Sequence, residues 1–119
     1  MLEGLYTLIA ESGDKTHPEA DVRLDAGHPV FAGHFPGRPV LPGVCQFELV
    51  RHLVQRRAGR PLSCRSVREL KFLSPVIPPQ DSLLRVELVL TDTGDGGIDV
   101  RGAISADGVQ KTKIKAIFV

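Results

Sequence analysis

The fold is decided by residues 28–53, which read HPVFAGHFPGRPVLPGVCQFELVRHL. The first sixteen of these residues include three glycines and four prolines, a composition typical of a rigid loop without regular structure. Pro42 can stand in the first turn of a helix, where its missing N–H costs nothing. From Val44 onward, apolar residues recur at helical spacing until Gly59, a natural helix stop. The pattern therefore predicts a loop that leads into a mostly buried helix over residues 42–58.

Two side chains of this stretch suit proton transfer better than packing. His34 lies between a glycine and an aromatic residue of the loop, and Glu48 lies on the helix between two apolar residues. Apolar surroundings disfavour the charged form of a carboxylate, so Glu48 is expected to be available as a proton donor. A histidine and a carboxylic acid on a rigid backbone are what general acid–base catalysis requires. The alternative is purely structural, with His34 in a capped loop and Glu48 at the edge of the helix.

Length and composition indicate a small aliphatic domain. The 119 residues are expected to form one domain, 1–119, and the absence of tryptophan leaves aliphatic side chains to fill the core. Oligomerisation commonly stabilises domains of this size. The net charge of +1 gives no argument for binding nucleic acid or a membrane surface, and no apolar run is long enough to span a bilayer.

The beginning of the chain and its two cysteines favour a cytoplasmic protein. No basic segment precedes the first apolar residues, so a secretory signal is not expected. Cys45 and Cys64 are spaced unlike the ligands of a metal or redox motif, and no metal site is predicted. Both are expected to be buried free thiols in a reducing compartment.

Charge is distributed unevenly along the chain. Residues 1–25 contain six acids and two bases, whereas residues 51–71 contain seven bases and one acid. The second segment suits an acidic partner, or it is a solvated surface that confers solubility, and the sequence leaves both interpretations open.

The rest of the chain predicts an antiparallel sheet. Strands are expected, from alternating apolar residues and flanking turns, over residues 5–11, 19–24, 64–73, 83–91, 98–105 and 109–119. The proline-rich segment 74–79 cannot hold regular structure, and residues 92–97 and 107–108 are expected hairpin turns. The last strand should have one solvent-facing side, formed by Lys111, Lys113 and Lys115. This order indicates an α+β fold, one antiparallel sheet with one helix packed on it.

A motif without gaps in the loop and helix resembles the signature of the 3-hydroxyacyl-ACP dehydratases of fatty-acid synthesis. It consists of HFPG at residues 34–37, PVLPGV at residues 39–44 and Glu48, in the family's order and spacing. Residues 71–81 are similar to the family's K-F-x-x-P-V-x-P-G-D, with Pro79-Gln80 in place of the single glycine. The resemblance implies the hot-dog fold, an antiparallel β-sheet wrapped around one central helix.

Dehydration of a 3-hydroxyacyl thioester needs a base for the C2 proton, an acid for the leaving hydroxyl and a donor to the thioester oxygen. His34 suits the base and Glu48 the acid, while the N–H of Gly43 at the helix start suits the oxyanion donor. By the resemblance, the carbonyl of Val40 would orient the His34 ring. The residues expected to bind the acyl chain are Phe35, Val44, Phe72 and Pro75.

The resemblance also implies how substrate and subunits come together. The substrate would arrive on the phosphopantetheine arm of an acyl carrier protein, with no metal and no diffusible cofactor, and leave as the trans-2-enoyl thioester. The chain would form a homodimer in which His34 of one subunit and Glu48 of the other share each site. A trimer of dimers is compatible with this arrangement, and no nucleic acid or membrane partner is implied.

After Glu48 the chain departs from the family, which has Ala-x-Ala-Gln where residues 49–52 read LVRH. In this respect it resembles homologues of specialised pathways, such as those that make aryl polyene pigments. His52, one turn beyond Glu48, either hydrogen-bonds to it or is an exposed or core-capping histidine. Two alternatives stay open: a hot-dog thioesterase, in which Glu48 would direct water at the thioester, and a non-catalytic partner subunit of a heterodimer. The HFPG loop argues against the first, and the intact pair of catalytic positions argues against the second.

Overall fold

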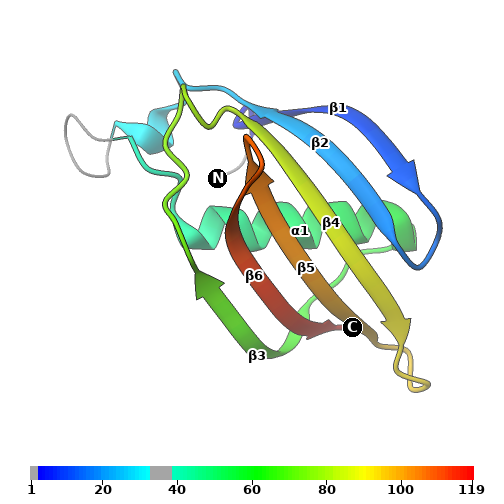
Figure 1. Ribbon diagram of the computed structural model, residues 1–119. Helices are drawn as coiled ribbons and strands as arrows, with labels where there is room; N and C mark the ends of the chain where they lie inside the picture. Colours follow the sequence, from blue (N-terminus) through cyan, green and yellow to red (C-terminus); the bar gives the residue numbers. More distant parts are fainter. Residues whose placement is uncertain (1–2, 33–38) are drawn as a thin grey trace.

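The computed structural model describes residues 3–32 and 39–119. Within this part, one α-helix, one short 3-10 helix and six strands follow in the order β1 (Tyr6–Gly13), β2 (Pro18–Leu24), η1 (Pro29–Phe31), α1 (Gly43–Ala58), β3 (Cys64–Phe72), β4 (Leu83–Asp92), β5 (Ile98–Ala106) and β6 (Val109–Phe118). The strands form one antiparallel sheet in the order β1-β2-β4-β5-β6-β3. Figure 1 shows α1 lying against one face of this curved sheet, which confirms the predicted α+β architecture.

Helix α1 begins and ends within one residue of the prediction. Pro42 occupies the N-cap position, and Gly59 ends the helix with a left-handed backbone at φ 71°. Arg56 and Arg57 lie in the last turn, where positive charge interacts favourably with the negative end of the helix dipole. The helix buries one face against the sheet through Cys45, Gln46, Leu49, Val50, Leu53 and Val54. No helix in the described residues is long and apolar enough to cross a membrane.

The central strands alternate as their sequences predict. Every second residue of β2, and of β4 from Leu84 to Leu88, is buried, and the intervening residues are more exposed. The buried members include Ala20, Val22, Leu24, Leu84, Val86 and Leu88. Together with the buried face of α1 they form the aliphatic core that composition indicated.

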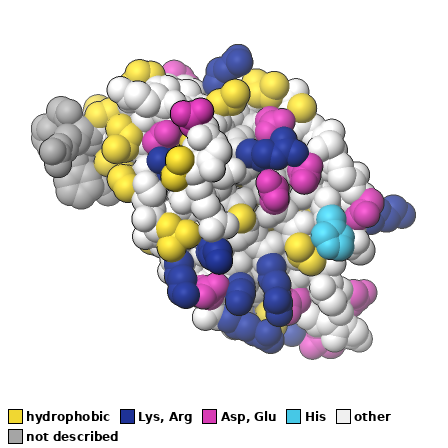
Figure 2. Space-filling model, in the orientation of Figure 1, with side chains coloured by type: hydrophobic (Ala, Val, Ile, Leu, Met, Phe, Trp, Pro, Cys, Tyr) yellow, Lys and Arg dark blue, Asp and Glu magenta, His cyan; other side chains and the backbone are white. Residues whose placement is uncertain are grey.

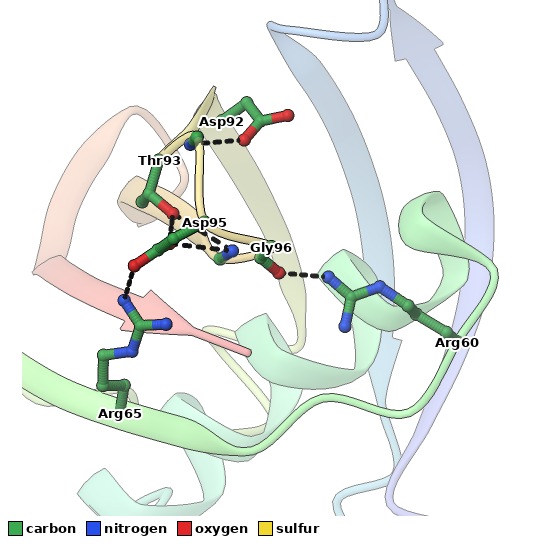
Figure 3. Close-up of polar contacts among 8 residues, drawn as sticks. Arg60, Arg65, Asp92, Thr93, Asp95 and Gly96 are labelled. Atoms are coloured by element: carbon green, nitrogen blue, oxygen red, sulfur yellow. Dashed lines mark hydrogen bonds and ion pairs between the residues drawn. The ribbon is translucent and has the colours of Figure 1, made fainter.

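The predicted hairpin turn at residues 92–97 is tied to the rest of the molecule by two arginines, as Figure 3 shows. Arg60, just after α1, donates from Nη2 to the carbonyl of Gly96 at 2.8 Å, and Arg65 of β3 donates to Asp95 at 3.1 Å. The hydrogen bonds from Thr93 and then Arg65 hold the pKa of Asp95 below its usual range. These contacts connect the segment after α1 and the start of β3 to the same hairpin turn between β4 and β5.

The prediction that three lysines of β6 face solvent is wrong for one of them, Lys111. Lys113 and Lys115 are exposed as expected, but Lys111 is only 8% exposed, and its Nζ lies 3.1 Å from Asp81. The reason is a register shift. Ile104 pairs with Thr112 while Ser105 pairs with Gln110, so Lys111 is an extra residue that turns inward.

Strand β3 lies at the edge of the sheet, and within residues 3–32 and 39–119 the one strand that it pairs with is β6. Its inward residues Val67, Leu70 and Phe72 are 48%, 38% and 52% exposed, because α1 covers them only in part. Cys64, predicted to be buried, is exposed at the start of this strand for the same reason, whereas Cys45 on α1 is buried.

Candidate active site

Five of the eight predicted site residues line one cavity of about 550 Å³. They are Val40, Gly43, Val44, Phe72 and Pro75. The cavity lies between the loop before α1, the first turn of α1 and the end of β3, so segments far apart in sequence meet there. A second hollow of about 560 Å³ adjoins it and shares Val40 and Pro75 with it.

The ring of Phe72 lies directly against Gly43 at the start of α1. A Cβ added at Gly43 would overlap this ring, so only glycine permits the close approach. The N–H groups of Cys45 and Gln46 both donate to the carbonyl of Pro42, at 3.0 and 3.2 Å. Those of Gly43 and Val44 have no acceptor among the described residues, as expected for the first N–H groups of a helix. The helix start is therefore suited to bind an anion or a polarised carbonyl.

The base of the cavity is formed by Gln46, a polar residue buried in the core. Its Nε2 donates to the carbonyl of Leu41 at 3.3 Å, and its Oε1 accepts from the hydroxyl of Thr112. The amide nitrogen and oxygen of Gln46 and the hydroxyl of Thr112 all have hydrogen-bond partners, so none of these buried polar atoms is left unpaired. Gln46 thus links the loop before α1, the helix itself and β6. The sequence showed Gln46 only as an unusual residue inside an apolar helix.

The wall of the cavity after β3 is held by the ion pair between the buried Lys111 and the partly buried Asp81. Asp81 also accepts from the N–H of Ile77 at 2.9 Å, and the carbonyl of Lys111 accepts from the N–H groups of Leu73 and Ser74. The N–H of Leu41 donates to the carbonyl of Val76 at 2.9 Å and ties this wall to the loop before α1. The proline-rich segment is thus fixed without regular secondary structure.

Glu48 lies outside the lining of this cavity, on the face of α1 that the sheet leaves open. The prediction of apolar surroundings is wrong: its Oε2 accepts from Arg51 Nε at 2.8 Å and lies 2.6 Å from Nη2. His52 Nε2 is 3.8 Å from the same oxygen, beyond hydrogen-bond distance. The signal for the pair with Arg51 was in the sequence, since residues three apart are neighbours on a helix.

His34 and Phe35 lie outside the described residues. The structure therefore tests neither the expected base nor the expected contact between its ring and the carbonyl of Val40. Both assignments stay predictions.

The basic segment 51–71 does not form one free patch. Five of its seven bases pair with carboxylates, namely Arg51, Arg56, Arg65, Arg68 and Lys71. Arg57 and Arg60 each donate to a backbone carbonyl. Local ion pairs therefore neutralise most of the charge that the sequence concentrates there.

A second basic cluster, which includes Lys71 of this segment, lies on the outer face of the sheet, and Lys71 and Lys115 both pair there with Glu69. Figure 2 shows lysine and arginine side chains gathered over β3 and β6, with acidic side chains over β2 and β4. Lys71 stands directly opposite Lys113, and Arg101 directly opposite Lys115, an arrangement that repels. The hydrogen bond from Lys71, with the charges of Lys115 and Lys113, holds the pKa of Glu69 below its usual range.

The family model of the ApeI-like group, described as ApeI dehydratase, matches residues 10–96. The chain therefore belongs to the ApeI-like dehydratase family. This confirms the resemblance to the 3-hydroxyacyl-ACP dehydratases and to their specialised homologues.

Curated relatives carry the name 3-hydroxyacyl-[acyl-carrier-protein] dehydratase FabZ. The protein from Brucella ovis is 36% identical over 69 residues, which cover 51% of this chain and 44% of that protein. The protein from Haemophilus influenzae is 28% identical over 96 residues, which cover 71% of this chain and 65% of that protein. The chain thus matches between about half and two thirds of the length of these relatives.

Solved structures share the fold at low sequence identity. The dehydratase heterocomplex ApeI:P from Xenorhabdus doucetiae has a TM-score of 0.80 at 23% identity, with 94% of this chain and 96% of that chain covered. A mutant thioesterase from Pseudomonas aeruginosa has a TM-score of 0.67 at 13% identity, with 98% and 82% covered. The predicted hot-dog fold is therefore confirmed. At these low identities, the solved structures show a shared fold and nothing about the activity of this chain.

Proposed function

We propose that the chain removes water from a 3-hydroxyacyl thioester on acyl carrier protein and forms the trans-2-enoyl thioester. The observation that carries this proposal is the cavity at the start of α1, where Val40, Gly43, Val44, Phe72 and Pro75 meet in a member of the ApeI-like dehydratase family. The names of the curated relatives supply the substrate class and the carrier. The pathway would be fatty-acid or polyene synthesis.

In this proposal, the N–H of Gly43 binds the thioester oxygen. Negative charge develops on that oxygen as the C2 proton leaves, and an N–H at a helix start stabilises it. The loss of one such donor typically costs about 2.7–4 kcal/mol of transition-state stabilisation. His34 and Glu48 are the acid–base pair that removes the C2 proton and assists the leaving hydroxyl, and the reaction uses no metal or diffusible cofactor.

The acyl chain would lie along Val44, Phe72 and Pro75, with Phe35 beside them in the loop. Val44 and Phe72 support this assignment because both expose much of their apolar surface inside or beside the cavity. A phosphopantetheine arm would bring the thioester to Gly43 from the carrier protein. The surface that suits an acidic carrier is the outer face of the sheet. Two pairs of cations stand opposite each other there, Lys71 with Lys113 and Arg101 with Lys115.

We further propose that residues 1–119 form a single domain that acts as a cytoplasmic homodimer, with trimers of dimers as a higher assembly. The outer edge of β3, which no strand of the described residues pairs with, and its half-exposed Val67, Leu70 and Phe72 support a second chain at this side. Each site would then combine His34 of one subunit with Glu48 of the other.

One observation favours a second candidate, a non-catalytic subunit of a heterodimeric dehydratase. Oε2 of Glu48 is already engaged by Arg51, which limits what this carboxylate can do in a reaction. The solved structure with a TM-score of 0.80 is itself described as a heterocomplex. The thioesterase among the solved structures, at 13% identity, supports only a shared fold.

The experiment is a mass assay on 3-hydroxyacyl carrier protein with the wild type, His34→Ala and Glu48→Gln. Arg57→Met serves as the control, because Arg57 lies on the same helix and donates to the carbonyl of Asp14. Loss of one water in the wild type and the control, but not in the two site variants, is the expected result. Release of free acid would instead identify a thioesterase. Binding without conversion by all four proteins would identify a partner subunit.

A further inference from the structure

We propose that a hollow at the C-terminal end of α1 binds a small organic phosphate. We call it the distal hollow, and with a volume of about 940 Å³ it is larger than either hollow at the candidate site. Its lining includes Lys15, Thr16, Arg57, Arg60, Leu90 and Ile98. Helix α1 has 16 residues, so about 24 Å separates its two ends. A ligand in the distal hollow would therefore not touch the site of the proposed dehydration.

Lys15, Arg57 and Arg60 bring positive charge to the distal hollow without a neutralising carboxylate. None of the three forms an ion pair among the described residues, whereas Arg56 beside them is paired with Glu11. Positive charge in the last turn of a helix is favourable in itself, so the helix end accounts for Arg57. Lys15 and Arg60 lie outside the helix, and their unpaired charges point to an anionic ligand.

The guanidinium of Arg60 is oriented by one contact with the backbone. Its Nη2 donates to the carbonyl of Gly96 at 2.8 Å, as Figure 3 shows. Nε and Nη1 make no hydrogen bond to the part of the chain that the structure describes. A neutral carbonyl orients the guanidinium without cancelling its charge. The remaining N–H groups of a guanidinium form a fork that fits the oxygens of a phosphate group.

The two carboxylates that line the distal hollow are engaged within their own turns. Oδ1 of Asp14 accepts from the N–H groups of His17 and Thr16 at 2.8 and 2.9 Å, and these bonds hold the pKa of Asp14 below its usual range. Oδ1 of Asp92 accepts from the N–H of Gly94 at 2.7 Å. The lining has four basic side chains against these two acids, so the field inside it favours an anion.

The inner wall of the distal hollow is apolar and held in place. Leu90 and Ile98 are half-buried and pack against the hydrophobic core. The N–H of Leu90 donates to the carbonyl of Thr16 at 2.8 Å, which ties the end of β4 to the turn before β2. No aromatic side chain of the described residues lines the hollow, so a nucleobase would have nothing to stack on. The lining therefore suits a phosphate ester with a compact apolar group.

Phenyl phosphate carries both features of this ligand, whereas inorganic phosphate carries only the charge. Isothermal titration calorimetry of the wild type should show tighter binding of phenyl phosphate than of inorganic phosphate. In a nitrogen-15 NMR titration, the backbone amides that shift should be those of residues 13–16 and 96–98. Absence of binding in the wild type, or shifts confined to residues 40–46, would overturn the inference.

Two variants and one control make the test specific. Arg60→Met should weaken binding of phenyl phosphate by about tenfold, because it removes charge-assisted hydrogen bonds, and Lys15→Met by about threefold. Arg23→Met removes an exposed arginine of β2 outside the lining and should leave the affinity unchanged. Equal weakening in Arg23→Met and Arg60→Met would overturn the inference, because the binding would then depend on net charge alone.

Two further results decide the remaining cases. Arg60→Met also loses the contact with Gly96, so if this variant does not fold, Lys15→Met decides alone, and an unchanged affinity would overturn the inference. Binding to vesicles of phosphatidic acid without binding of either soluble phosphate would overturn it as well, because the ligand would then be a lipid headgroup. None of these measurements needs turnover, so binding by a wild type that removes no water would support this inference while the proposed function fails.

Discussion

Strands β4 and β3 belong to the same sheet and both carry apolar residues on their inner faces, but α1 covers β4 far more fully than β3. Leu84, Val86 and Leu88 of β4 are buried against α1, whereas Val67 and Leu70 of β3 remain partly exposed. The difference is one of position, since β4 lies inside the sheet and β3 at its edge. The inner face of β3 thus has more apolar surface than α1 covers, and we call this incompletely covered part of the molecule the open side. The candidate site lies on the open side.

The open side also carries polar pairs of two kinds. Gln46 lines the cavity and accepts from the hydroxyl of Thr112, and both side chains are buried. Glu48 lies outside the cavity lining and pairs through Oε2 with Arg51, and these two side chains are about a quarter exposed. The core against β4, which is the covered side, thus holds apolar side chains, whereas the candidate site brings polar groups together.

The largest effect on stability should come from the covered side. Leu53→Ala removes a buried side chain of α1 and should lower the free energy of unfolding by about 2–5 kcal/mol. Leu70→Ala, a matched change on the open side, should cost less than about 1 kcal/mol in the monomer. Urea unfolding of both variants at low protein concentration measures the two values. Equal losses of unfolding free energy in the two variants would show that the inner face of β3 is packed as tightly as the core around α1.

The next effect concerns assembly. Val67→Lys places a charge on the half-exposed inner side of β3 and should weaken self-association by about tenfold or more, because burying an unpaired ammonium group is unfavourable. Val89→Lys changes an exposed valine on the outer face of β4 and should leave association unchanged. Sedimentation equilibrium gives both dissociation constants. A stronger effect of Val89→Lys would place the interface on the outer face instead.

A smaller effect is expected at the contact between Gly43 and Phe72. Gly43→Ala introduces a methyl group where the ring lies, and the ring can turn outward, so the expected cost is about 1 kcal/mol of stability. In a Phe72→Leu background the same change should cost almost nothing. A double-mutant cycle of unfolding free energies measures this coupling. Additive effects would show that the ring does not constrain residue 43 in solution.

The smallest effect should come from the outer face. Reversing two charges with Lys113→Glu and Lys115→Glu should raise KM for carrier-bound substrate by about three- to fivefold at low salt and leave KM for a pantetheine thioester unchanged. The difference should fade as ionic strength rises. Equal changes for both substrates would mean that this cluster does not bind the carrier protein.

Much of the fold could be predicted because local signals agreed with one another. Pro42 and Gly59 mark the ends of α1, and strict alternation marks β2 and β4. The gathering of five predicted site residues around one cavity follows from the motif, because the loop, the helix start and the end of β3 meet there. What these cases share is that each signal is contained in a few adjacent residues.

The errors arose where a distant contact decided the outcome. Lys111 turns inward because of a bulge on β6 and a pairing with Asp81, neither of which alternation alone can show. Cys64 is exposed because β3 is an edge strand, which depends on the order of the whole sheet. Glu48 differs, since its partner Arg51 lies one helical turn away and the pair was open to prediction.

In the proposed assembly, a second copy of the chain closes the open side and completes each site. The most direct test mixes two inactive variants, His34→Ala and Glu48→Gln, after dissociation and reassembly. Random pairing makes half of the dimers mixed, and each mixed dimer holds one intact site, so about a quarter of wild-type dehydratase activity should return. If the mixture stays as inactive as its parents although native mass spectrometry shows mixed dimers, His34 and Glu48 of different subunits do not share a site.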